Sequence, residues 1–564
     1  MLKNAIEKLT KRFPDIHRFG FIAITIFIFN IIAIWGAKNP VWDDAHTYWY
    51  VVANKFPHFL VNGGSIIAAI CEWFSWHLMV MFSIQLVRFI YVLFLLIPLS
   101  WLFYKLLRRY FDIPEIPALF ASIIPAILPS QWQVPALTND SYPIPILLLS
   151  LAALLCGYRY MDTDQKPKRW ISCAFFLYLL ATQYYDNAVF MFPVLFLAAL
   201  FYKKFNRKTL FILMAYTLPF LLKLTWIIVF PRQPAAERVW QNFQEIIKRI
   251  YYYFISMTPL PYSFLRQSPK LFLIIVAIII VTGFTIYFFK KGFSSTSIEN
   301  THDETKPYGF LNPRFRILFV YTFFFVWIVS TIILFITASV WRQERYFFIT
   351  AYAFNALLIL SLYAILEKIL GKKKKIIAAV FIILVIVSGT FRFMELKKIY
   401  DDYNRQDSIM KNELVKHKNV ANPQILVYIP DKWINYWDLD EQSTGFLQYW
   451  MNKKKDVWGT FIHHREYTYI KKAPRYWNKP KIYWERPLFL YAYKDGKFTQ
   501  YEYALIWKQS SDNQYWWRIY KFDKNTGLRS TLVEGNGLPQ YRETVKDLRN
   551  KGIITGKILW GEPL

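Results

Sequence analysis

Cysteine is scarce in this sequence, and the motifs of nucleotide-dependent enzymes are missing. Three cysteines occur among 564 residues, and Cys71, Cys156 and Cys173 show neither disulfide nor metal-ligand spacing. They lie within or beside apolar segments, which favours a packing role. The chain contains no phosphate-binding loop and no dinucleotide fingerprint. These absences argue against a disulfide scaffold and against a fold built to bind nucleotides.

Acidic residues are also few, since 38 Asp and Glu stand against 68 Lys and Arg, for a net charge of +30. Such a balance can indicate nucleic-acid binding, but here the basic clusters separate apolar blocks. In the predicted topology all of them fall on one side, which the positive-inside rule makes cytoplasmic. Anionic lipid headgroups are the expected counter-charge. The clusters are Lys3–Arg18, Lys105–Tyr110, Tyr158–Arg169, Lys203–Lys208, Lys290–Phe293, Asn312–Arg316 and Lys368–Lys375.

Long apolar blocks fill residues 1–395 of a chain that is 55% hydrophobic and 20% aromatic. Many approach the ~20 residues that a transmembrane helix needs. They do not alternate polar and apolar residues as barrel strands would. We therefore expect an all-α polytopic membrane protein with about eleven transmembrane helices. The predicted spans are 20–37, 78–104, 115–130, 141–158, 170–185, 187–202, 209–230, 271–289, 317–338, 346–366 and 376–392.

The predicted topology places the N-terminus in the cytoplasm and the C-terminus outside it. The first apolar block, Phe21–Ala37, has no small-residue cleavage site and is interpreted as a retained span. An odd number of spans then exports the C-terminus. From Asn422 onward, short aromatic and β-branched runs are separated by Asn, Asp and Gly turns, namely "KDGKF", "KNTGL" and "EGNGL". The aromatic rings of these runs favour a core role over stacking on sugars. We expect a transmembrane domain, residues 1–395, and a small strand-rich extracytoplasmic domain, residues 396–564.

Carboxylates and arginines gather in segments predicted to lie on the non-cytoplasmic side. Asp43 and Asp44 follow the first span, Asp140 precedes the fourth, and Arg342 and Arg345 occupy a short connection. Taken singly, these residues fit helix caps or contacts with lipid headgroups. Taken together, they suit a site where a carboxylate is a general base or metal ligand and arginines hold a phosphate. Arginines on the exported side also run against the positive-inside bias.

The stretch "VWDDAHTY", residues 41–48, resembles the W-D-E-A-H stretch after the first span of protein O-mannosyltransferases. It is also similar to the D-E pair of aminoarabinose transferases, and both groups belong to the GT-C superfamily of polyprenyl-phosphate-sugar-dependent glycosyltransferases. Residues 138–155 and 342–360 resemble two further stretches of these enzymes. Arg88 lies where family members carry an arginine near the start of the second span. The chain departs from the family in having Asp44 for glutamate and in lacking prolines after Tyr346.

This resemblance implies an inverting glycosyltransferase that moves a sugar from a polyprenyl-phosphate donor to an acceptor hydroxyl of a cell-envelope glycan, lipid or protein. Transfer would take place on the non-cytoplasmic face. We expect the protein to lie in a bacterial inner membrane and to have no nucleic-acid partner. A divalent metal ion stays open, since no H-x₃-H or H-E-x-x-H spacing supports one. The implied residues are catalytic Asp43, Asp44 and Asp140, donor-phosphate-binding Arg342, Arg345, Tyr346 and Arg88, and acceptor-binding or supporting Trp42, His46 and Asn139.

Three other functions remain open from the residues themselves. One is a cell-wall binding scaffold in which the aromatic C-terminal tail is the active part. A transporter or flippase for lipid-linked glycans would also need charge inside the membrane. It predicts broken helices at matched positions of two halves, and the sequence has no internal repeat. A ligase or polymerase for lipid-linked glycans would share the donor but transfer a whole glycan.

Overall fold

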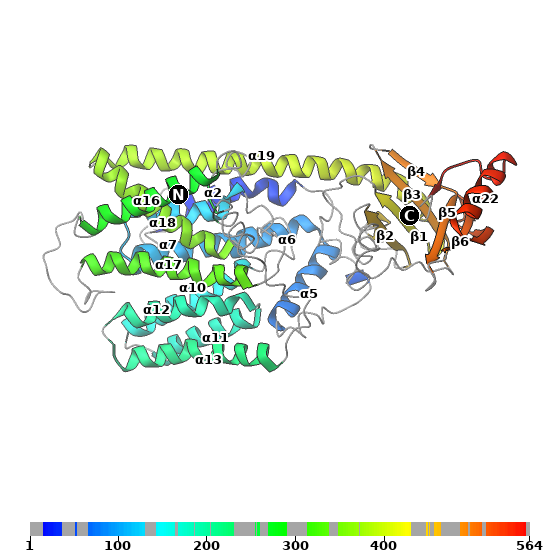
Figure 1. Cartoon of the computed structure of the whole chain (residues 1–564). Coiled ribbons are helices and arrows are strands. Elements are labelled where there is room, and N and C mark those ends of the chain that lie inside the picture. The colour runs from blue at the N-terminus through cyan, green and yellow to red at the C-terminus, as the bar shows by residue number, and fades with distance from the viewer. Residues whose placement is uncertain are drawn as a thin grey trace, which may run out of the picture. The chain divides into compact units, whose positions relative to one another are not determined.

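Two compact units make up the described part of this chain, in a computed structural model shown in Figure 1. Among the described residues, 15–36 and 66–399 form the helical unit, and 51–52 and 400–559 form the strand unit. The structure describes residues 15–36, 51–52, 66–129, 143–163, 167–184, 186–203, 205–229, 254, 257–259, 269–289, 313–337, 348–371, 373–429, 447–448, 450–451, 456–463, 486–494, 497–509 and 515–559.

Helices occupy every apolar block that the sequence predicts as a span. Seven described helices are long and apolar enough to cross a membrane, and the other four predicted spans are also helical. The helices are α2 (Ile16–Trp35), α5 (Ile66–Met81), α6 (Ile84–Ile90), η1 (Tyr91–Leu96), α7 (Ile97–Lys105), η2 (Leu106–Tyr110), α8 (Glu115–Ile123), η3 (Ile124–Ile127), α10 (Pro143–Asp162), α11 (Pro167–Tyr184), η5 (Asp186–Met191), α12 (Phe192–Tyr202), α13 (Arg207–Val229), α16 (Pro269–Phe289), α17 (Pro313–Thr337), α18 (Phe348–Leu370) and α19 (Lys374–Leu414).

The second and last predicted spans differ from the observed helices at their ends. Residues 78–81 belong to α5 rather than to the second span. Ser83 has an extended backbone, and its Oγ accepts a hydrogen bond from the Leu86 amide at 3.1 Å. This N-cap starts a new helix at Ile84. The helix that contains the last predicted span, α19, runs for 41 residues to Leu414, well past the predicted end at residue 392.

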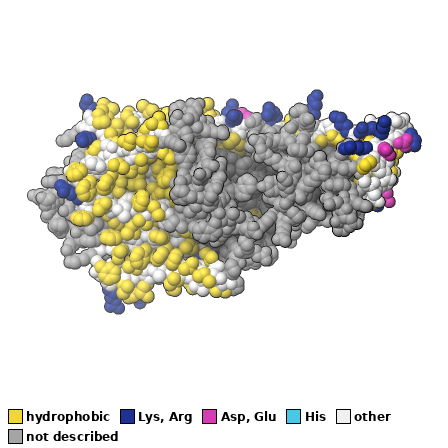
Figure 2. Space-filling view, in the orientation of Figure 1, with side chains coloured by type: hydrophobic (Ala, Val, Ile, Leu, Met, Phe, Trp, Pro, Cys, Tyr) yellow, Lys and Arg dark blue, Asp and Glu magenta, His cyan; other side chains and the backbone are white. Residues whose placement is uncertain are grey.

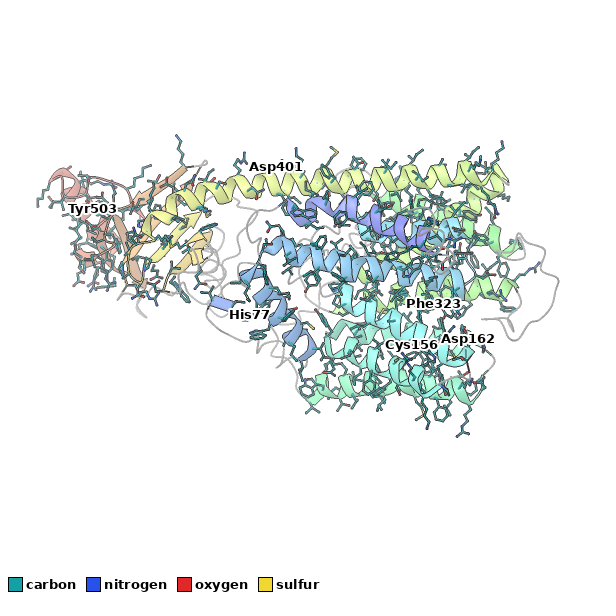
Figure 3. The ribbon with its side chains drawn as sticks, turned by 180° about the vertical axis from the view of Figure 1, so that it is seen from behind. His77, Cys156, Asp162, Phe323, Asp401 and Tyr503 are labelled. Atoms are coloured by element: carbon teal, nitrogen blue, oxygen red, sulfur yellow. The ribbon has the colours of Figure 1, made fainter. Side chains whose placement is uncertain are left out.

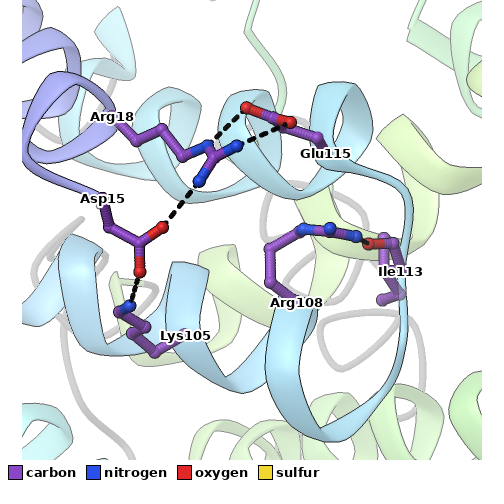
Figure 4. A network of polar contacts seen from close by, with 6 residues as sticks. All are labelled: Asp15, Arg18, Lys105, Arg108, Ile113 and Glu115. Atoms are coloured by element: carbon purple, nitrogen blue, oxygen red, sulfur yellow. Dashed lines mark hydrogen bonds and ion pairs between the residues drawn. The ribbon is translucent and has the colours of Figure 1, made fainter. Parts of the chain in front are cut away.

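Ion pairs gather at one end of the helical unit, which we call the basic end (Figure 4). Arg18 Nε donates to Glu115 Oε1 at 2.5 Å, and Arg18 Nη1 donates to Asp15 Oδ1 at 2.6 Å. Lys105 Nζ donates to the other Asp15 oxygen, and this hydrogen bond holds the pKa of the Asp15 carboxyl below its usual range. The starts of α2 and α8 therefore lie beside the end of α7. Arg18 and Lys105 belong to two of the clusters predicted to be cytoplasmic.

Apolar side chains cover the outside of the helical unit. Figure 2 shows this face, where yellow side chains spread over the helices and dark blue Lys and Arg side chains lie mainly along the margin. Large residues such as Leu222, Ile278, Phe325 and Ile383 are exposed on helices of this unit. A hydrophobic patch of this extent is not stable in water, and it matches the outer surface of a helical bundle in lipid. The chain is an integral membrane protein.

A glycine allows α16 and α18 to pack closely. A Cβ placed on Gly283 would overlap the backbone of Ser361. The Ser361 hydroxyl hydrogen-bonds the Tyr321 hydroxyl of α17 at 2.9 Å. Small residues at helix contacts let backbones approach when no hydrophobic force drives helices together in lipid.

Two four-stranded sheets and the helix α22 make up most of the described strand unit. In the first sheet, with order β2-β1-β3-β4, β1 is parallel to β2 and β3, and β3 is antiparallel to β4. In the second, with order β7-β6-β5-β8, β6 is antiparallel to β5 and β7, and β5 is parallel to β8. The bounds are β1 (Gln424–Ile429), β2 (Trp458–His463), β3 (Leu488–Lys494), β4 (Lys497–Tyr501), β5 (Tyr503–Gln509), β6 (Tyr515–Phe522), β7 (Arg529–Asn536), α22 (Leu538–Asn550) and β8 (Ile558–Leu559).

The aromatic residues of the strand unit build its core, as the sequence favours. Trp517, Tyr503 and Tyr541 are almost fully buried in one cluster. Trp517 Nε1 donates to the carbonyl of Gly537 at 2.9 Å. Gly537 has φ 79°, which glycine adopts readily, so the predicted turn "EGNGL" becomes the passage from β7 into α22.

A buried histidine joins the end of the long helix to the first sheet. His417 closes the short helix η7 (Val415–His417), stacks on Phe489 with ring centroids 3.6 Å apart, and hydrogen-bonds the Tyr491 hydroxyl. Burial lowers the pKa of His417 from 6.5 to about 4. The imidazole is therefore neutral at pH 7.

Candidate functional site

The structure places one of the predicted site residues, and that residue is Arg88. The others lie outside the described residues, so the structure does not show which of them come together. They are Asp43, Asp44, Asp140, Arg342, Arg345, Tyr346, Trp42, His46 and Asn139. The described helix ends that flank them are the end of α2, the end of η3, the start of α10, the end of α17 and the start of α18.

Arg88 lies inside the helical unit with none of its surface exposed. It occupies α6, at the start of the span whose other end carries Lys105 of the basic end. Arg88 is therefore at the end of the helical unit opposite the basic end. A guanidinium at membrane depth is expensive, by about 2.5–3.5 kcal/mol on insertion scales, and such residues mark functional sites by default.

The backbone changes its winding directly after Arg88. Residues 91–96 form a π-helical stretch, η1, between α6 and α7. π-Helical turns inside α-helices are frequent at functional sites. They widen the helix and shift the direction in which side chains on either side point, so the turn changes the angle between Arg88 and the rest of the span.

A buried carboxylate and two tyrosines lie near the start of the same span. Glu72 of α5 is 6% exposed. It is within electrostatic range of Tyr184 at the end of α11, and Tyr184 shares a hydrogen bond with Tyr91 of η1. α5 packs against both α6 and α11. Buried acidic, phenolic and cationic side chains therefore occur together at this end of the helical unit.

His77 of α5, which is labelled in Figure 3, has a local role. Its Nδ1 donates to the carbonyl of Trp73, one turn earlier, at 2.7 Å, and its ring lies 4.2 Å from the Trp73 ring. Among the residues that the structure describes, no group of three or more His, Cys, Asp or Glu is placed to hold a metal ion. The predicted catalytic carboxylates lie outside the described residues.

A helix also stops inside the protein at the end opposite the basic end. Leu128 follows η3 in an extended conformation, with φ −64° and ψ 134°. The carbonyls of the last helical residues therefore have no partner within the helix. Ala126, Ile127 and Leu128 are all buried, and an unpaired carbonyl at membrane depth costs several kcal/mol.

Side chains from α2 and α19 bind these carbonyls. Arg392 Nη1 donates to the Leu128 carbonyl at 2.6 Å, and Arg392 Nη2 donates to Asn30 Oδ1 at 2.9 Å. Asn30 Nδ2 donates to the Ala126 carbonyl at 3.2 Å, and Ser388 Oγ donates to the Ile127 carbonyl at 3.3 Å. We call Asn30, Ser388 and Arg392 the polar clamp. It fixes the point from which the chain continues toward Asn139 and Asp140.

The polar clamp was not predicted from the sequence. Asn30 and Arg392 each interrupt an apolar block, and they are 362 positions apart. A polar residue inside a predicted span is a usable signal. It does not say which other span supplies the partner.

The helical unit, its buried charges and the separate sheets define this chain as a polytopic membrane protein with a strand-rich C-terminal unit. No protein-family model matches the chain, and no curated protein matches it. An Archaeoglobus fulgidus oligosaccharyltransferase, tethered with an acceptor peptide that contains an NVT sequon, is similar over 81% of this chain and 64% of its own. Its TM-score is 0.39 and its identity 13%.

The oligosaccharyltransferase AglB from the same organism, in complex with an inhibitory peptide and a dolichol-phosphate, covers 80% of this chain and 65% of its own. Its TM-score is 0.38 and its identity 12%. This chain thus spans less than two thirds of the length of either protein. Similarities this distant do not transfer an activity, which has to be argued from the residues of this chain.

Proposed function

We propose that this protein is an inverting glycosyltransferase that moves a sugar from a polyprenyl-phosphate donor to an acceptor hydroxyl on the non-cytoplasmic face. The observation that carries the proposal is the complete burial of Arg88 at the end opposite the basic end. If the basic end is cytoplasmic, Arg88 lies toward the outer leaflet. A lipid-linked phosphate entering sideways from that leaflet would meet a guanidinium in a low-dielectric setting, where its attraction is strong.

The proposed reaction has one displacement step. Asp43 accepts the proton of the acceptor hydroxyl as general base, and the acceptor oxygen forms a bond to the anomeric carbon. The bond between that carbon and the phosphate oxygen breaks, the configuration inverts, and the lipid phosphate leaves with its electron pair. Arg88, Arg342 and Arg345 stabilise the negative charge that develops on it. Asp44 and Asp140 orient the acceptor.

Arginine suits this role better than lysine. Its planar fork donates two parallel hydrogen bonds to phosphate, and it stays charged when buried. Arg88 also lies one turn before the π-helical stretch η1, and π-helical turns are frequent at functional sites. These features support a ligand role for Arg88.

The test compares Arg88→Gln and Asp43→Asn with the parent protein in nanodiscs, using a radiolabelled polyprenyl-phosphate sugar extracted from the host membrane. We expect Arg88→Gln to weaken donor binding and to slow transfer by about 10²- to 10³-fold, as for loss of one charge-stabilising donor. Asp43→Asn should abolish transfer and leave donor binding unchanged, because it removes the base and not the phosphate contact.

A matched control is Lys223→Gln, which removes another fully buried cation of the helical unit that has no place in the proposed donor site. It should bind the donor as the parent does. If Arg88→Gln binds donor lipid normally, the phosphate role of Arg88 is wrong. If Asp43→Asn transfers sugar at the parent rate, the general-base assignment is wrong.

A further inference from the structure

The strand unit contains a hollow lined by positive charge. It has a volume of about 470 Å³ and lies between α22, the end of β4 and the start of β8. Four of its nine lining residues are cations and none is a carboxylate. The cations are Arg542, Lys546, Arg549 and Lys557, all exposed. A hollow of this size is in the range of sites for small ligands.

The helix α22 aligns three of these cations. Arg542, Lys546 and Arg549 are spaced i, i+4 and i+7, so they share one face of the helix. The neighbouring stripe, which includes Tyr541 and Val545, packs into the core. The core therefore holds α22 in a fixed rotation, and its basic stripe faces the hollow without a rearrangement.

Ordinary helix electrostatics explains only part of this pattern. A cation in the last turn of a helix offsets the negative end of the macrodipole, and Arg549 lies there. Lys557 is outside the helix, next to β8, and gains nothing from that dipole. Across the described chain, Lys546, Arg549 and Lys557 form no ion pair, whereas Lys551 on the same helix pairs with Asp547 at 2.7 Å.

The remaining lining groups favour a sugar over a bare anion. Tyr501 is half-buried and carries a hydroxyl, and Asn550 carries both a donor and an acceptor that suit vicinal hydroxyls. The arginine forks match a phosphate or carboxylate oxygen pair. The hollow is concave, which suits a discrete head group rather than a flat bilayer.

We propose that this hollow binds an anionic carbohydrate, meaning a saccharide that carries a phosphate or a carboxylate. The inference goes beyond the glycosyl transfer proposed above and does not depend on it, since the strand unit alone provides the hollow. If the saccharide is part of an acidic glycan of the cell envelope, its binding in the hollow would hold the protein at that glycan.

The probes are mannose 6-phosphate and glucuronic acid, titrated against the full-length detergent-purified protein by saturation-transfer NMR. Two matched probes accompany them: mannose, which lacks the charge, and inorganic phosphate, which lacks the sugar ring. We expect at least one charged sugar to bind about tenfold more tightly than either matched probe, and to weaken as salt rises from 50 to 500 mM. The two charged sugars distinguish a phosphate from a carboxylate ligand.

Two double variants test the location. Lys546→Gln with Lys557→Gln removes two cations from the hollow, and should weaken binding by about 3- to 30-fold, as for two exposed charge contacts. Lys497→Gln with Lys521→Gln removes two exposed lysines of the same unit from outside the hollow, and should change binding little. Arg549→Glu should abolish binding by reversing a charge inside the hollow.

Three results would overturn the proposal. If inorganic phosphate binds as tightly as the charged sugars do, the hollow is a simple anion site. If the two double variants weaken binding equally, the effect is one of net charge. If phosphatidylglycerol vesicles compete fully with the sugar, with the same dependence on Lys546 and Lys557, the hollow is a lipid-headgroup site.

Discussion

Replacing Asn30 by leucine tests whether the polar clamp stabilises the helical unit. Leucine has the same branched arrangement of side-chain heavy atoms as asparagine but cannot donate or accept a hydrogen bond. The change removes two bonds to other helical segments, the one from Arg392 at 2.9 Å and the one to the Ala126 carbonyl at 3.2 Å. It also removes a bond to the Ile26 carbonyl at 2.8 Å within α2 itself. A bond to a charged group contributes about 1.5–3 kcal/mol and a neutral one about 0.5–1.5 kcal/mol.

The two bonds to other helical segments together contribute about 2–4.5 kcal/mol, and the lower end is the better expectation for this site. Hydrogen bonds between membrane helices average about 0.6 kcal/mol in double-mutant cycles, because the unfolded chain in lipid also finds partners. Leucine also recovers part of the loss by packing among apolar neighbours. We therefore expect Asn30→Leu to lower the free energy of unfolding by about 2 kcal/mol.

The assay is equilibrium unfolding in mixed dodecyl maltoside and SDS micelles, followed by circular dichroism. Arg392→Met and the double variant complete a cycle, whose coupling energy isolates the contact between the two side chains. We expect a coupling of about 1 kcal/mol. If the two single changes add to within about 0.3 kcal/mol, the contact at 2.9 Å does not stabilise the fold and the reasoning is refuted.

Two further predictions concern packing and pH. Gly283→Ala should destabilise the protein by about 1–3 kcal/mol, because the added methyl meets the Ser361 backbone. The control Gly20→Ala has open space around the new methyl and should be neutral or stabilising. Equal melting temperatures for the two variants would contradict close packing of α16 and α18. Thermal stability of the strand unit should fall as the pH drops from about 6.5 to about 4, because the unfolded chain binds a proton at His417 in that window and the folded chain does not. His417→Phe should flatten this pH dependence, and an unchanged slope would show that other groups cause it.

The sequence predicted most of the helical architecture from local pattern. Each apolar block became a helix, as the block from residue 143 to 162 shows. The runs in the C-terminal third became strands, and the turns "KDGKF" and "KNTGL" fall between β3 and β4 and between β6 and β7. Errors occurred where one side chain decides a boundary, as Ser83 does when it delays the start of the predicted second span to Ile84.

The candidate site was predicted less completely. Arg88 was singled out by resemblance, and the structure adds that it is fully buried and precedes a π-helical stretch. The roles of the predicted carboxylates stay predictions. Neither Glu72 with Tyr184, nor the basic hollow of the strand unit, was visible in the sequence, because their members come from separate elements.

The sequence by itself determined that this chain is a membrane protein, because the length and apolarity of a segment decide whether it can satisfy its backbone in lipid. It also determined that one part of the chain is helical and the other rich in strands, because the spacing of hydrophobic residues along the chain is a local property. Only the tertiary structure decided which polar groups meet. Arg392 finds Asn30 and the Leu128 carbonyl across more than 260 positions, and no local pattern encodes that pairing, since it depends on which helices pack together.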